Sequence, residues 1–118
     1  AKIIGAFLEN IRAGGQKKIA SLSSGLGSIT NLAWAGKYGY CASKAGLNMV
    51  SKGLAEWLKP ENIMVISLSP GWTRTAMGGP HATNSAEESV SGMRHVISSL
   101  TLAETGRFWN FDGVELPW

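Results

Sequence analysis

The sequence predicts an α/β protein in which a doubly wound parallel sheet lies between two layers of helices. Three features predict this three-layer α/β/α class. Helical and strand patterns alternate along the chain, which is the order of a parallel sheet built from right-handed crossovers. Residues 64–68 form an almost unbroken apolar run, as expected of a strand that helices cover on both faces. Segments rich in serine, glycine and proline follow two of the strands, where loops leave a sheet.

The chain begins with a predicted helix and a predicted strand. Residues 2–13 carry apolar side chains at helical spacing and are followed by Gly14 and Gly15, which can close a last helical turn. Residues 18–23 are predicted to form a short strand, and this strand runs into the small-residue loop 24–27.

A second, longer helix is predicted over residues 40–59, where Pro60 ends it. Its apolar stripe consists of Leu47, Val50, Leu54 and Leu58. Its small residues would permit close approach of another element; they are Ala42, Ala45, Gly46 and Gly53.

The last third of the chain supplies a third helix and a third strand. Ser85 and Glu88 have the spacing of a capping box, and the helix that follows has an apolar stripe made of Val90, Met93, Ile97 and Leu100. Residues 107–111 are the last predicted strand, and an Asp-Gly turn lets the tail 114–118 fold back. Three strands make a small sheet whose edges need cover.

Composition indicates one domain, spanning residues 1–118, with 44% apolar and 16% charged residues as in compact globular proteins. The net charge is +3 and the basic residues are scattered, which argues against a nucleic-acid partner. Cys41 is the only cysteine, and the two histidines lack metal-ligand spacing, so we expect a cytoplasmic protein without a metal site. The charged residues within 2–13 argue against a signal peptide or membrane span.

Tyr40 and Lys44 stand four residues apart, hence on one face of the predicted helix about one turn from each other. A phenol is a poor acid or base near neutral pH, and a neighbouring ammonium favours the phenolate. The pair therefore suits acid-base chemistry. By itself the spacing is weak evidence, because it arises often by chance.

Two further features lie at the same edge of the predicted sheet. Ser24 ends the first strand, where open parallel sheets place ligand-binding groups, and its hydroxyl could hold a substrate carbonyl. Residues 70–75 leave the next strand at the same end. A Ser-Ser-Gly loop in isolation is equally consistent with a polar turn. The convergence of these features with Tyr40 and Lys44 on one edge is what predicts an active site.

In three motifs the chain resembles the second half of the short-chain dehydrogenases/reductases, namely Ser24-Gly25, Tyr40-x-x-x-Lys44 and Pro70-Gly71-x-x-x-Thr75. Within that family it looks most like the C-factor-like branch, because of its Gly-Gly-Pro segment at 78–80 and its Asp-Gly-x-Glu-Leu-Pro-Trp ending at 112–118. The resemblance implies a partial Rossmann-like fold, made of the last three strands and their flanking helices.

The resemblance also implies carbonyl/alcohol hydride transfer with NAD or NADP. Tyr40 would be the general acid/base, Ser24 would polarise the carbonyl, and Lys44 would favour ionisation of the phenol and hold the nicotinamide ribose. Residues 72–84 would form a mobile loop over the substrate. The 16-residue gap from Ser24 to Tyr40 exceeds the family's commonest spacing, so Ser23 stays open as an alternative. The implied cofactor-binding residues are Tyr40, Lys44, Pro70, Gly71, Thr73 and Thr75.

The family's amino-terminal glycine fingerprint, which binds the pyrophosphate, has no match in this sequence. The family's catalytic Asn belongs upstream of Ala1. We therefore expect the dinucleotide-binding half to be absent and the isolated chain to be inactive, with doubtful binding of NAD or NADP. The alternative is a non-catalytic, self-associating interaction or signalling module related to C-factor.

We expect a homodimer or larger homo-oligomer. The family commonly packs the helices equivalent to 2–13 and 40–59 against the same pair of another subunit, and their apolar stripes suit that contact. The strand at 18–24 would also expose an edge that invites pairing.

Overall fold

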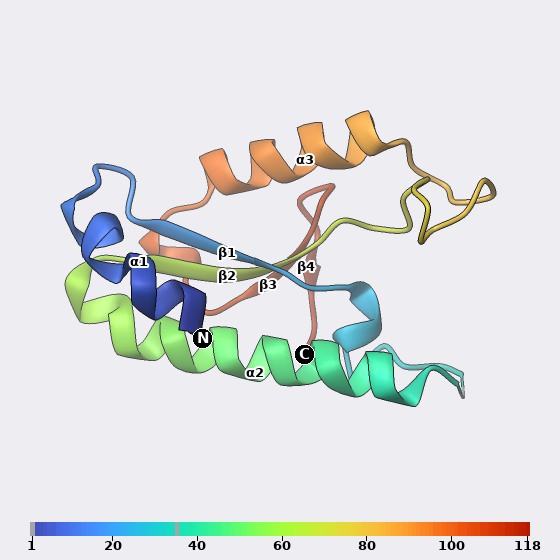
Figure 1. Cartoon of the computed structure of the whole chain (residues 1–118), viewed down its shortest axis with the longest axis horizontal. Coiled ribbons are helices and arrows are strands. Elements are labelled where there is room, and N and C mark those ends of the chain that lie inside the picture. The colour runs from blue at the N-terminus through green and yellow to red at the C-terminus, as the bar shows by residue number, and fades with distance from the viewer. Residues whose placement is uncertain (1, 35) are drawn as a thin grey trace.

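The computed structural model describes residues 2–34 and 36–118, so Ala1 and Ala35 of the predicted domain lie outside the described residues. Figure 1 shows helices on both faces of a sheet. The helices are α1 (Lys2–Ala13), α2 (Tyr38–Leu58) and α3 (Ala86–Ser99). The strands are β1 (Lys18–Leu22), β2 (Met64–Ser69), β3 (Phe108–Asn110) and β4 (Glu115–Leu116). They lie in the order β1-β2-β3-β4, with β1, β2 and β3 parallel and β4 antiparallel to β3. The predicted α/β class is confirmed.

The ends of the first elements agree with the sequence prediction to within two residues. α1 has the predicted bounds, and α2 begins at Tyr38 instead of residue 40 because the chain turns at Lys37, whose φ of 47° is left-handed. After α2, Pro60 stands in the short 3-10 helix η2 (Lys59–Glu61). Among the described helices, none is long and apolar enough to cross a bilayer.

The main apolar cluster lies between the sheet and the helices α1 and α2. Ile19 of β1 and Val65 of β2 are register neighbours and point to this face. The cluster consists of Leu8, Ile19, Ala55, Leu58, Ile63 and Val65. At its border, Arg12 in the last turn of α1 donates two hydrogen bonds of 2.6 and 2.7 Å to the carboxylate of Glu61 in η2. These hydrogen bonds hold the pKa of Glu61 below its ordinary value.

The predicted apolar stripe of α2 is only partly buried. Leu58 is fully buried and Leu54 packs against the cluster, but Val50 is 43% exposed. The side chains that α2 buries are mostly small or polar; they are Cys41, Asn48, Ser51, Ala55 and Leu58. Small side chains let a helix lie close to a sheet, so the buried side of α2 is not its most apolar side. The prediction of this stripe was wrong in that respect.

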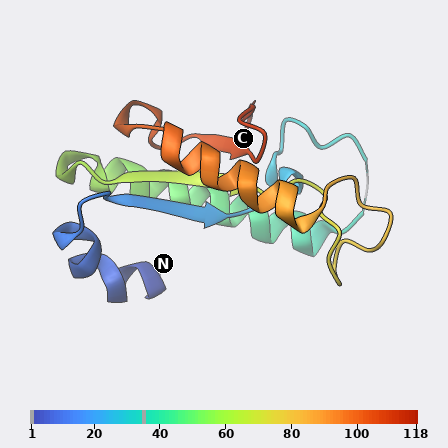
Figure 2. The ribbon, with the colours of Figure 1, turned by 90° about the horizontal axis from the view of Figure 1, so that it is seen from above.

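Helix α3 lies over the opposite face of the sheet, as Figure 2 shows from above. The predicted capping box is present: Glu88 N–H donates to Ser85 Oγ at 3.0 Å, and Ser85 N–H donates to the Glu88 carboxylate at 2.7 Å. The residues that α3 buries are Ser89 and Val96, whereas Val90 of the predicted stripe is half exposed. An open groove of about 250 Å³ lies between α3 and β1, lined by Ala20, Leu22, Leu68, Val90, Met93, Arg94 and Ile97.

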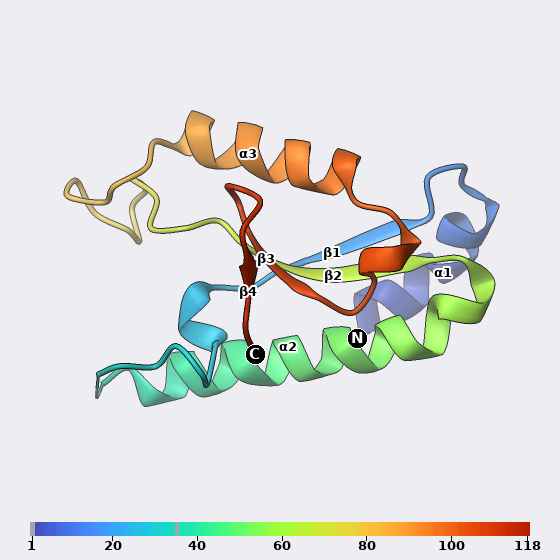
Figure 3. The same ribbon diagram turned by 180° about the vertical axis from the view of Figure 1, so that it is seen from behind.

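The tail adds a fourth strand that the sequence indicated only as a fold-back. β3 is shorter than the predicted strand 107–111, and β4 pairs with it in the antiparallel direction, as seen from behind in Figure 3. Trp118 stacks on Phe108 with ring centroids 5.6 Å apart. The carbonyl of Trp118 accepts hydrogen bonds from Thr30 Oγ1 at 2.7 Å and Thr30 N–H at 3.0 Å. Within the described residues, the outer edge of β1 pairs with no strand.

Candidate functional site

The loops that follow β1 and β2 leave the sheet at the same end, which is the right-hand end in Figure 1. The first turn of α2 lies at this end too. Carboxyl ends of parallel strands are where open α/β sheets bind their ligands. The structure therefore brings the three predicted motifs to one edge.

Ser24 lies at the rim of this edge, and Ser23 lies inside. Ser24 is the amino-terminal cap of the short 3-10 helix η1 (Gly25–Gly27), and its Oγ accepts the Leu26 N–H at 3.2 Å. Within the described residues the Ser24 hydroxyl donates to no acceptor, so its proton is available to a ligand. Ser23 is 3% exposed, and its hydroxyl points to the Lys44 carbonyl at 3.5 Å.

Tyr40 and Lys44 occupy the first two turns of α2. The Nζ of Lys44 lies 5.7 Å from the centroid of the Tyr40 ring, within the range of a cation-π interaction. The same Nζ donates a hydrogen bond of 3.2 Å to the carbonyl of Leu22, the last residue of β1. The ammonium of Lys44 is thus near both the Tyr40 ring and the strand end that precedes Ser24.

Gly27 lets η1 lie directly on α2. A Cβ at this position would be 2.9 Å from the carbonyl carbon of Lys44 and 3.0 Å from Nδ2 of Asn48. The Asn48 amide in turn donates to the Gly27 carbonyl at 3.3 Å. The spacing between the Ser24 loop and the helix that bears Tyr40 is therefore set by backbone contact.

The turn after β2 holds the remaining predicted residues. Gly71 has a φ of +70°, and a Cβ there would collide with two neighbouring side chains. Thr73 Oγ1 donates to the Pro70 carbonyl at 2.9 Å. Thr75 Oγ1 accepts the Gly78 N–H at 3.1 Å. Both threonine hydroxyls therefore shape the loop itself.

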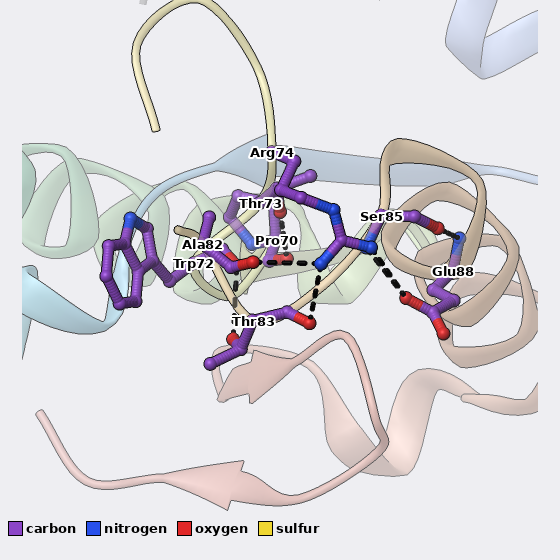
Figure 4. Close-up of polar contacts among 8 residues, drawn as sticks. All are labelled: Pro70, Trp72, Thr73, Arg74, Ala82, Thr83, Ser85 and Glu88. Atoms are coloured by element: carbon purple, nitrogen blue, oxygen red, sulfur yellow. Dashed lines mark hydrogen bonds and ion pairs between the residues drawn. The ribbon is translucent and has the colours of Figure 1, made fainter. Parts of the chain in front are cut away.

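Residues 72–84 form a loop that is closed on itself through Arg74 (Figure 4). The Nη1 of Arg74 donates to the carbonyls of Ala82 and Thr83 at 2.9 and 3.1 Å, and its Nη2 lies 4.0 Å from the Glu88 carboxylate. Thr83 Oγ1 donates to the Trp72 carbonyl at 3.2 Å. The two arms of the loop are thereby joined next to the start of α3.

Two buried serines of the site were missed by sequence reasoning. Ser69, the last residue of β2, accepts the N–H groups of Gly25 and Gly71, at 3.0 and 3.3 Å. Ser89 in α3 donates to the Pro70 carbonyl at 2.7 Å. The one sequence feature that could have identified Ser69 is its position next to the Pro70-Gly71 pair. No spacing rule identifies a serine whose hydrogen-bond partners are backbone groups far away in the sequence.

The residues of this edge fit one end of a dinucleotide better than the other. Tyr40, Lys44 and the turn 70–75, which the family resemblance assigns to the nicotinamide end, share the edge. An ammonium has three donors, of which Lys44 uses one for Leu22. At the phosphate end, the sequence has no glycine-rich strand-to-helix turn. The amino end of α3 already holds the Glu88 carboxylate, whose pKa is lowered by hydrogen bonds from Ser85 and by the charge of Arg74.

The chain belongs to the short-chain dehydrogenase family, whose model matches residues 2–86. Among its relatives, C-signal of Myxococcus xanthus is 39% identical over 117 residues, which cover 99% of this chain and 70% of that protein. The carbonyl reductase Sniffer of D. melanogaster is 40% identical and superposes with a TM-score of 0.83 over 86% of this chain and 41% of the other. The NADPH-bound carbonyl reductase from chicken fatty liver superposes with a TM-score of 0.90 at 31% identity.

The chain spans about half the length of the solved relatives that it matches. The superposition covers 98% of this chain but only 51% of the chicken carbonyl reductase. The family resemblance seen in the three motifs and the partial Rossmann-like fold are thereby confirmed.

Proposed function

We propose that this chain carries the Ser24-Tyr40-Lys44 site of an NAD(P)-dependent oxidoreductase that interconverts a carbonyl and an alcohol. The observation that carries the proposal is the position of the Lys44 ammonium. It lies 5.7 Å from the Tyr40 ring centroid and 3.2 Å from the Leu22 carbonyl, two residues before Ser24. A phenol, an ammonium and a free hydroxyl proton therefore share the edge at which an α/β sheet binds ligands.

Each side chain has one role in the proposed reaction. When bound, the dinucleotide supplies or accepts the hydride. Ser24 donates its hydroxyl proton in a hydrogen bond to the substrate carbonyl oxygen. Tyr40 gives that oxygen a proton during reduction and removes it during oxidation. Lys44 offers its remaining N–H donors to the nicotinamide ribose.

We propose that the isolated 118-residue chain does not catalyse the reaction. The support is the sequence, in which no glycine-rich turn can bind the pyrophosphate, and Glu88, which fills the amino end of α3. Without phosphate contacts a dinucleotide loses much of its binding energy. Titration of the isolated chain with NADPH and NADH, followed by quenching of the five tryptophans, should show weak binding. Turnover by the isolated chain would contradict this statement.

The role of Tyr40 is testable in a fusion in which this chain replaces the matching half of chicken carbonyl reductase. We expect NADPH-dependent reduction of a small ketone, and we expect Tyr40→Phe to lower kcat about 10²–10⁴-fold because the proton donor is lost. Tyr38→Phe is the matched control, since Tyr38 is 70% exposed in the same turn of α2. Equal rates for wild type and Tyr40→Phe, or a folded, NADPH-binding fusion without activity, would contradict the proposal.

We also propose that the chain forms a homodimer or larger homo-oligomer through the outer sides of α1 and α2. Large apolar side chains are exposed there; they are Ile3, Phe7, Met49, Val50 and Trp57. If a Cβ were added at Gly46 or Gly53 of α2, no atom of a neighbouring described element would lie within 4 Å of it. These two positions therefore leave room for a close helix contact. The free outer edge of β1 is a further surface for pairing.

Sedimentation equilibrium at micromolar concentration tests this assembly. Trp57→Glu should weaken it at least about tenfold, because a charge would be buried in the contact. Trp72→Glu is the matched control, as Trp72 is similarly exposed but lies in the loop after β2. A folded monomer of 12.5 kDa across this range would contradict the proposal. Self-association combined with an inactive fusion would favour the second candidate function, a non-catalytic interaction or signalling module related to C-signal.

A further inference from the structure

One buried hydroxyl joins the two loops of the candidate site. Ser69 ends β2 and is 2% exposed. Its Oγ accepts the Gly25 N–H at 3.0 Å from the loop after β1 and the Gly71 N–H at 3.3 Å from the loop after β2. Gly25 is the neighbour of Ser24, and Gly71 is the second residue of the turn 70–75. A single side chain therefore contacts both loops that carry predicted site residues, the one after β1 and the one after β2.

The turn after β2 is held from its other side as well. The Pro70 carbonyl accepts hydrogen bonds from the hydroxyls of Ser89 at 2.7 Å and Thr73 at 2.9 Å. Gly71 stands between these contacts in a left-handed conformation that other residues rarely adopt. Ser89 anchors the turn after β2 to α3. Because Ser69 accepts N–H groups from this turn and from the Ser24 loop, it holds the Ser24 loop at a set distance from the anchored turn.

The same strand contains a matched position without these contacts. Ser67 lies two residues earlier, hence on the same face of β2, and is fully buried. Within the described residues its hydroxyl has no hydrogen-bond partner. Replacing Ser67 or Ser69 with alanine removes the same atoms from the same strand. Only the change at Ser69 removes hydrogen bonds to the site loops.

We propose that Ser69 is a positioning residue, which sets the distance between the Ser24 hydroxyl and the turn 70–75. The inference rests on the proposed function and adds to it a residue that lies outside the Ser-Tyr-Lys set. Reacting groups must be placed to within a fraction of an ångström, and a displacement of about 1 Å can cost about 10²-fold in rate. A hydroxyl that holds both loops at one point supplies that placement.

Hydrogen exchange of the isolated chain, measured by NMR, tests the contact without any activity. In Ser69→Ala we expect the amides of Gly25 and Gly71 to exchange at least about tenfold faster relative to the amides of β2, since both lose their acceptor. In Ser67→Ala the two amides should keep their wild-type ratio to β2. Unchanged exchange at either glycine in Ser69→Ala would overturn the proposal, because the hydroxyl would then not hold both loops.

Kinetics of the fusion with chicken carbonyl reductase test the positioning role. Ser69→Ala should lower kcat about 10–100-fold and change the KM for NADPH by less than about threefold, because placement of the reacting groups is lost while most cofactor contacts remain. Ser67→Ala should stay within about twofold of wild type. Faster exchange without a fall in kcat would overturn the proposal. A folded, NADPH-binding wild-type fusion without activity would refute the proposed function and the positioning role with it, whereas the exchange data would still decide the contact.

Discussion

The two faces of the sheet differ in how completely helices cover them. On the face of α1 and α2, Ile19, Leu58 and Val65 are buried in one continuous cluster. On the face of α3, Leu22 of β1 is 57% exposed and Val90 of α3 is 50% exposed across an open groove. β1 thus has one face in a closed core and the other largely in solvent.

The difference arises from where α3 makes its close contact. At Gly92 a Cβ would lie 2.4 Å from the carbonyl oxygen of Phe111, so α3 lies against the segment that follows β3. On its other side, α3 and the residue after it accept hydrogen bonds from β1, where Lys18 Nζ donates to the carbonyls of Ile97 and Leu100 at 2.8 Å each. Over β1, burial of apolar surface, the main stabilising contribution, is therefore concentrated on the α1/α2 face. On the α3 face the buried apolar side chains belong to β2 and α3, among them Ile66, Leu68 and Val96.

The largest effect should come from the closed face. Leu58→Ala removes a fully buried side chain from the cluster and should lower the free energy of unfolding by about 2–5 kcal/mol. Leu22→Ala, the same change at the groove, should cost about 0.5 kcal/mol or less. Urea denaturation of both variants measures the difference. Equal losses would mean that the groove side contributes as much to stability as the cluster does.

Glycine substitutions distinguish the close and the open sides of the helices. Gly92→Ala should destabilise by about 1–3 kcal/mol, because its Cβ has no space next to Phe111. In the dissociated monomer, Gly53→Ala should stabilise by about 0.5–1 kcal/mol, since its Cβ has open space among the described residues and alanine favours a helix. The same denaturation experiment applies. A stabilising Gly92→Ala would show that α3 can move away from Phe111 without cost.

The capping box tests how much α3 depends on its own end. Ser85→Ala removes the acceptor of the Glu88 N–H and should cost about 1 kcal/mol. Ser91→Ala, at an exposed position within the same helix, should change stability by less than about 0.5 kcal/mol. Thermal or urea unfolding followed by circular dichroism measures both. If Ser85→Ala is silent, contacts of α3 with the sheet are sufficient to keep its first turn formed.

The smallest effect should come from acid. The folded pKa values of Glu61 and Glu88 are lowered, by hydrogen bonds from Arg12 and Ser85 respectively, so their contribution to stability is present above the ordinary value of about 4.3. It is lost as the pH falls through the folded values. Urea midpoints between about pH 7 and 3 should therefore fall less steeply for Glu61→Gln than for wild type. Identical slopes would show that the Arg12 contact at the border of the closed face carries no pH dependence.

The sequence predicted that helices cover both faces of the sheet, but not how completely they cover each face. Helix α1 and the Ser85 cap follow from periodicity and from local side-chain-to-backbone bonding, which neighbouring residues decide. The buried side of α2 was predicted wrongly, because the residues that α2 buries are those with small side chains, which let the helix lie close to the sheet. The same limit applies to the outward position of Trp57, which depends on where α2 packs.

By itself, the sequence determined the order of helices and strands as far as β3, the family, and the three motifs at one edge of the sheet, because these follow from local patterns and from strand direction. The tertiary structure decided which of two adjacent serines lies at the rim and which hydroxyl joins the loops. The contact of Ser69 with Gly25 spans 44 positions. No local pattern encodes such a contact, since it depends on how β1 and β2 align after the whole sheet has formed.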